Sequence, residues 1–129
     1  MLRKSGVALC SIIILLLAAC GTASNANSTS PSSGNTVHMN SMQFVQSSIA
    51  IKKGESITLV ADTVTPHIIA NGAWEQGQAH PGAETGTPQV KDLQVAGNSS
   101  QTIGPFTTAG TFKFYCTIHA GMNLTVQVA

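Results

Sequence analysis

Charged and aromatic residues are scarce in this chain of 129 residues. Only 9% of the residues are charged and 5% are aromatic, with a single Trp and a single Tyr. Beyond Arg3 and Lys4 the formal balance is four lysines against five acidic residues, 4 − 5 = −1. The chain therefore lacks the basic stripe of a nucleic-acid-binding protein, and it has no acidic block for a strongly cationic partner.

No apolar run is long enough to span a bilayer as a mature helix. The longest, residues 7–17, follows Arg3 and Lys4, and this pattern is typical of an export signal. The next residues, Leu-Ala-Ala-Cys ending at Cys20, resemble the lipobox of bacterial lipoproteins, in which the Cys is lipidated and becomes the new N-terminus. The alternative is ordinary secretion with an unmodified Cys20.

These features predict that residues 1–19 are a lipoprotein signal peptide. Residues 20–36 have neither charge nor large apolar side chains, so we expect the lipidated Cys20 to begin a flexible Ser/Asn-rich tether. The protein is then expected to be exported and lipid-anchored at the outer face of the cytoplasmic membrane without crossing it.

Cysteine is rare, and its positions are informative. Cys10 falls in the predicted signal peptide and Cys20 would carry lipid, so Cys116 is the only thiol left for the folded part. A lone thiol cannot form an internal disulfide. In an exported domain it indicates metal ligation or a reactive role.

From residue 37 onward, apolar residues alternate with polar ones. Phe112, Phe114 and Cys116 share one face of an expected strand, and Lys113 and Tyr115 share the other. Residues 49–51, 57–61 and 124–128 alternate in the same way. No amphipathic helix of convincing length is present. The pattern predicts one all-β domain over residues 37–129, a Greek-key β-sandwich or barrel.

Residues 71–92 interrupt this alternation with repeated glycines and prolines. Such a long connection is typical of a functional loop. Within it, we expect Trp74 to pack onto the sandwich and His80 to be solvated. The alternative is that either residue contacts a redox partner.

Near the C-terminus, Cys116, His119 and Met122 stand in the run Cys-Thr-Ile-His-Ala-Gly-Met, and His67 lies far upstream. A thiolate, two imidazoles and a thioether favour a copper electron-transfer site. Strand parity directs the Cys116 side chain into the interior, where a metal would hold it as a thiolate. Spacing alone also permits zinc, but a thioether is a poor zinc ligand and no Cys-x-x-Cys pair is present.

Other histidines and methionines compete for these roles. His38 is expected at the surface or a sheet edge, whereas His80 is the stronger rival to His67. Met39 and Met42 are alternatives to the thioether ligand, although we expect both to fill the core.

Residues 37–129 resemble the cupredoxins, the small blue-copper proteins that include plastocyanin, pseudoazurin and amicyanin. The resemblance is strongest over residues 112–122, a Cys-x-x-His-x-x-Met loop of the short, amicyanin-like kind, and extends to the turn at 53–55 and to Thr-Pro-His at 65–67. It implies a mononuclear type 1 copper site, with His67, Cys116 and His119 as the trigonal plane and Met122 as the axial ligand.

One position departs from the family. In many cupredoxins the first His is followed by an Asn whose side chain braces the Cys-bearing loop, but Ile68 stands here. Thr117 keeps the hydroxyl often found after the Cys, so part of the surrounding hydrogen bonding is expected to persist. The resemblance also implies that electrons pass through His119, and Tyr115, expected to face outward, offers a second route.

The sequence thus predicts a one-electron carrier that serves redox partner proteins of a respiratory or other electron-transfer chain. No His-x-His pair and no second Cys near Cys116 are present, which argues against a multicopper enzyme or a binuclear copper centre. Copper carriage or storage with the same ligands is the alternative function.

Overall fold

The computed structural model describes residues 34–129. The predicted signal peptide, Cys20 and most of the predicted tether therefore lie outside the described residues. Within 34–129, no helix has the length and apolar character needed to cross a membrane. The described residues form nine strands: β1 (Thr36–Met39), β2 (Ser48–Ile51), β3 (Ile57–Ala61), β4 (His67–Glu75), β5 (Gln78–Pro81), β6 (Leu93–Val95), β7 (Ser100–Ile103), β8 (Gly110–Cys116) and β9 (Asn123–Val128).

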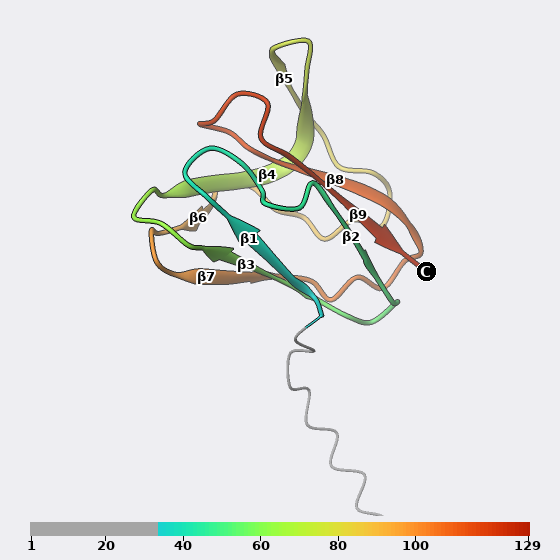
Figure 1. Cartoon of the computed structure of the whole chain (residues 1–129). Helices are drawn as coiled ribbons and strands as arrows, with labels where there is room; N and C mark the ends of the chain where they lie inside the picture. The colour runs from blue at the N-terminus through green and yellow to red at the C-terminus, as the bar shows by residue number, and fades with distance from the viewer. Residues whose placement is uncertain (1–33) are drawn as a thin grey trace, which may run out of the picture.

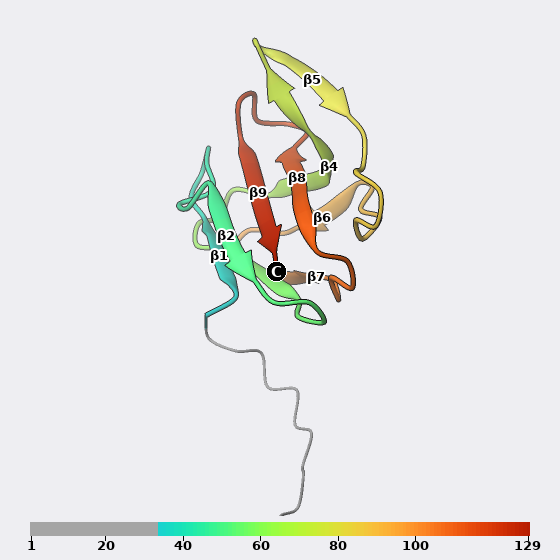
Figure 2. The same cartoon turned by 90° about the vertical axis from the view of Figure 1, so that its right-hand side faces the viewer.

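The strands make two sheets, as Figures 1 and 2 show. The smaller sheet has the order β1-β3-β7, and the larger has the order β2-β9-β8-β4-β5 with β6 paired to β4. The pairs β1–β3 and β2–β9 are parallel, and the others are antiparallel. The predicted all-β architecture is confirmed.

The core lies between the two sheets and follows the alternation read from the sequence. On β8, Phe112, Phe114 and Cys116 are all buried, as predicted. The ring of Phe106 lies 5.9 Å from that of Phe112 and 6.0 Å, edge-on, from that of Phe114. Each such side chain contributes about 1.5–3 kcal/mol by leaving water. The end of β8 is therefore held firmly, and that end carries Cys116.

Strand β4 is nine residues long and continues beyond the sandwich to form a hairpin with β5. The prediction of a continuous irregular connection over 71–92 is therefore wrong for its first half. Gly72 permits the hairpin: its φ is +128°, and a Cβ there would collide with the His80 backbone. The glycines obscure the alternation of polar and apolar residues in this segment. A β-hairpin also depends on pairing with a partner strand, which local alternation does not reveal.

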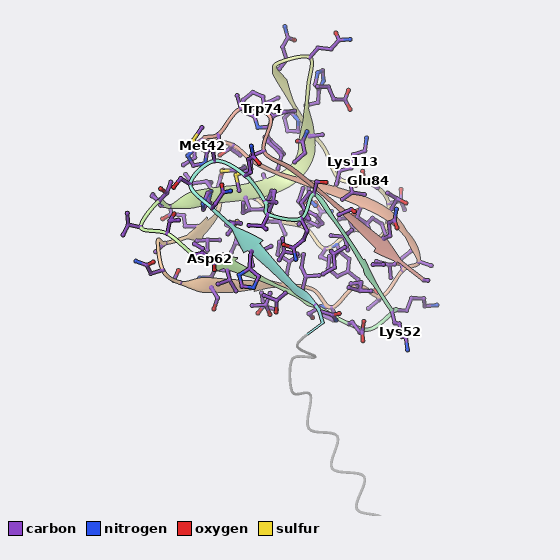
Figure 3. All side chains as sticks on the ribbon, viewed as in Figure 1. Met42, Lys52, Asp62, Trp74, Glu84 and Lys113 are labelled. Carbon is purple, nitrogen blue, oxygen red and sulfur yellow. The ribbon has the colours of Figure 1, made fainter. Side chains whose placement is uncertain are left out.

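The rest of that segment is tied back to the sheet by Asn71. The buried Asn71 amide donates to the Pro88 carbonyl at 3.1 Å, and its side-chain oxygen accepts from the Val90 N–H at 2.6 Å. Glu84 accepts from the Lys113 backbone N–H at 3.2 Å, and Figure 3 shows these two residues side by side. Residues 82–92 thus form a strap with defined hydrogen bonds.

Candidate metal centre

Two neighbouring strands of the larger sheet position the first two predicted ligands. Cys116 is the last residue of β8 and is opposite Ile69 on β4. His67, the first residue of β4, lies two positions from Ile69, so both side chains point to the same face. Both ligands are buried, with exposed fractions of 0% for Cys116 and 1% for His67.

The turn between β8 and β9 supplies the other two. The Cys116 N–H donates to the Met122 carbonyl at 3.0 Å, and the Met122 N–H donates to the His119 carbonyl at 3.2 Å. Gly121 has a φ of +80°, which suits glycine and closes the turn. The turn leaves His119 half-buried and Met122 buried.

The donor atoms converge as a metal site requires. The ligand atoms of His67, Cys116 and His119 all lie within 4.8 Å of one another. Sγ of Cys116 is 3.8 Å from Nδ1 of His67 and 3.3 Å from Nδ1 of His119. The two imidazole rings meet at 64°, with centroids 5.0 Å apart. Two imidazole nitrogens aimed at one sulfur fit a soft or borderline metal ion.

Electrostatics favour the metal-binding form of His67. Burial lowers its pKa below the usual value, the electrostatic influence of the neighbouring His119 lowers it further, and a hydrogen bond with the Asn40 backbone raises it by less. A neutral imidazole can donate a lone pair to a metal, whereas the protonated ring cannot. Burial therefore keeps His67 ready to bind.

The competing side chains lie elsewhere. His38 is exposed, and its Nδ1 contacts both carboxylate oxygens of Asp62, at 2.9 and 3.0 Å. His80 is exposed on β5, as predicted. Met39 is buried in the core, but the same prediction for Met42 is wrong, because Met42 is 57% exposed. It lies in the connection between β1 and β2, outside both strands.

Tyr115 differs from its predicted outward position. It is 5% exposed, and its ring packs edge-on against Trp74, with centroids 6.0 Å apart at 87°. Lys113, which has the same strand parity, remains exposed and lies 3.7 Å from the Glu75 carboxylate. Strand parity correctly placed Tyr115 on the face opposite Cys116. The β4–β5 hairpin covers Tyr115 on that face, and strand parity does not predict which element packs there.

The loop is also braced by residues that the sequence did not reveal. The backbone of Ile68 accepts from the Thr117 N–H at 2.8 Å, so the strand ladder continues past Cys116 without a side-chain contribution from position 68. The indole N–H of Trp74 donates to the Cys116 carbonyl at 2.8 Å. Asn123 in turn binds the Trp74 backbone. No spacing rule links a hairpin Trp to this turn.

Comparison with known proteins agrees with this geometry. Residues 32–129 match the family described as copper binding proteins, plastocyanin/azurin family. The chain belongs to this family. It is 33% identical to plastocyanin of Scenedesmus fuscus over 87 residues, which are 66% of this chain and 85% of that protein. It is 29% identical to plastocyanin of Daucus carota over 85 residues, 66% of this chain and 84% of that protein.

The fold of this cupredoxin is also that of a solved relative. The crystal structure of amicyanin from Paracoccus versutus superposes with a TM-score of 0.57 at 23% identity, covering 78% of this chain and 86% of amicyanin. The cupredoxin resemblance and the copper cofactor are thus confirmed, and His67, Cys116, His119 and Met122 are positioned as a type 1 copper site. This family and donor set are those of a blue-copper electron-transfer protein.

Proposed function

We propose that this cupredoxin is a mononuclear one-electron carrier and not an enzyme, with His67, Cys116, His119 and Met122 as its copper ligands. The convergence of two Nδ1 atoms on the Cys116 sulfur carries the proposal. When bound, copper supplies reversible one-electron chemistry by cycling between Cu(II) and Cu(I). The absence of His-x-His pairs from the sequence supports a single redox centre.

The chain's part in electron transfer is to keep the ligands in place. His67 and Cys116 are buried on adjacent strands, so neither can move far when the charge of the site changes. A site that keeps its geometry needs little rearrangement between oxidation states. His119 is half-buried beside the 50% exposed Ile118, which makes it the ligand nearest to solvent and the proposed electron port.

The carrier is proposed to be exported and lipid-anchored through Cys20 at the outer face of the cytoplasmic membrane. The export and lipobox pattern of residues 1–20 supports this location. β1 begins at the end of the sandwich away from the β8–β9 turn in Figure 1. A tether leading to β1 therefore presents the copper end to partner proteins of a respiratory or other electron-transfer chain.

The test is to load residues 35–129 with Cu(II) and record the visible spectrum and its reversible bleaching on reduction. We expect an intense thiolate-to-copper band that Cys116→Ser removes. A missing band, or a band that survives this substitution, contradicts the type 1 assignment.

Copper carriage or storage would use the same donors and is distinguished by exchange. A carrier of electrons should retain copper against a chelator over many redox cycles. Release of copper within seconds would favour carriage instead.

A further inference from the structure

Trp74 reaches the copper-binding turn from a separate part of the fold. It is the second-to-last residue of β4, opposite Ala79 of β5, and Figure 3 shows it on the side of the hairpin toward the β8–β9 turn. Its indole N–H donates to the backbone carbonyl of Cys116 at 2.8 Å. The copper ligand is therefore held by a side chain that is not itself a ligand.

The hydrogen bonding of the turn leaves the Cys116 carbonyl available to such a donor. The Cys116 N–H donates to the Met122 carbonyl, and in a regular antiparallel pair the Met122 N–H would donate to the Cys116 carbonyl in return. The Met122 N–H instead donates to His119, which closes the ligand turn. A buried carbonyl without a hydrogen-bond partner destabilises the fold, and the Trp74 indole N–H supplies that partner.

Trp74 is itself fixed from two sides. The Asn123 side chain accepts from the Trp74 backbone N–H at 2.7 Å and donates to the Trp74 backbone carbonyl at 2.9 Å. The Tyr115 ring packs edge-on against the indole. The donor is thus rigid, and a rigid donor transmits its orientation to the group that it binds.

We propose that Trp74 is a positioning residue for the Cys116 thiolate and that its indole N–H stabilises the reduced copper site. The proposal rests on the copper ligation by Cys116 proposed above. Reduction adds one electron, and no proton, to the site. The positive end of the N–H dipole points at the Cys116 backbone in a partly buried environment, where it favours the more negative, reduced state.

The experiment exploits the fact that Trp74 is the chain's only Trp. Growth on β-(3-benzothienyl)alanine replaces the indole N–H by sulfur in a ring of nearly the same shape. The matched control is growth on 4-fluorotryptophan, which keeps the N–H and undergoes the same incorporation. Both proteins are loaded with Cu(II), and the reduction potential, the thiolate-to-copper band and copper release to a chelator are measured.

We expect the benzothienyl protein to keep the band but to show an equilibrium constant for reduction about threefold lower than the control. That ratio corresponds to a potential ~28 mV lower, at 59 mV per tenfold change for one electron. Copper release should also be faster. Trp74→Phe, which keeps an aromatic ring without a donor, should likewise lower the reduction potential and speed copper release.

A readout without copper checks the contact itself. The single indole N–H resonance of the apo protein should exchange slowly with solvent, because its proton is engaged with Cys116. Rapid exchange would overturn the proposal. So would a potential and a copper-release rate equal to those of the fluorotryptophan control in a protein that retains its band. A band missing from the unsubstituted protein would instead refute the copper assignment itself.

Discussion

His67 and Cys116 are 49 residues apart in the sequence, yet Nδ1 of His67 lies 3.8 Å from Sγ of Cys116. The contact exists because β4 and β8 are antiparallel neighbours, with Ile69 opposite Cys116. The first residue of one strand is thereby brought to the last residue of the other. A rigid pair of strands, rather than a flexible loop, holds the two ligands, and the following predictions test this arrangement.

Replacing His67 should damage copper binding far more than replacing His80. His67→Gly removes a buried donor 3.8 Å from the thiolate, and we expect copper affinity to fall at least ~100-fold, since even indirect partners of a metal are worth about 10–100-fold. His80→Gly is the matched control, because His80 is exposed on β5. Chelator competition measures both. A larger loss of copper affinity in the His80 variant would mean that His80, and not His67, is the ligand.

Phe114→Ala should strongly destabilise the apo protein. Phe114 is fully buried and contacts Phe106 edge-on, so the truncation leaves a cavity and should cost about 3–5 kcal/mol. Val45→Ala, at a position 62% exposed, should change stability by no more than about 0.5 kcal/mol. Urea denaturation of both variants compares them. Similar losses would mean that the core does not lie between the sheets at β8.

Asn71→Ala should release the strap over residues 82–92. The substitution removes the acceptor of the Val90 N–H and the donor to Pro88, and because both partners are only half-buried, their loss should cost less than the about 1–3 kcal/mol of a fully buried unsatisfied group. Amide hydrogen exchange should show the Val90 N–H losing protection while the amides of β9 remain protected. Unchanged protection at Val90 would mean that Asn71 does not anchor the strap.

Glu55 should contribute to the acid limb of the stability profile. Its pKa is lowered, first by the hydrogen bond from the Lys52 backbone N–H and then by Asn35. A carboxyl whose pKa is lower in the folded state stabilises the fold above its unfolded pKa, and this contribution is lost as pH falls through the folded pKa. Denaturant melts of Glu55→Gln across this pH range should therefore show a shallower loss than the native chain. Parallel curves would contradict the prediction.

The alternation around Phe112, Phe114 and Cys116 was sufficient to predict the all-β fold and the buried orientation of the thiolate. Strand periodicity is a local property, so burial on one face is visible in the sequence itself. The ligands in residues 116–122 could also be recognised from the sequence, because the spacing of Cys116, His119 and Met122 suits one short turn around one ion. The signal peptide, the lipidated Cys20 and the location remain predictions.

Only the tertiary structure decided which distant groups surround that turn. The burial of Tyr115, the exposure of Met42 and the hydrogen bond from Trp74 to Cys116 depend on the β4–β5 hairpin and on the positions of strands far apart in the sequence. Non-local pairing leaves no periodic signal in either partner. The sequence alone therefore determined the ligand types and the fold class, whereas strand pairing determined how firmly the site is held.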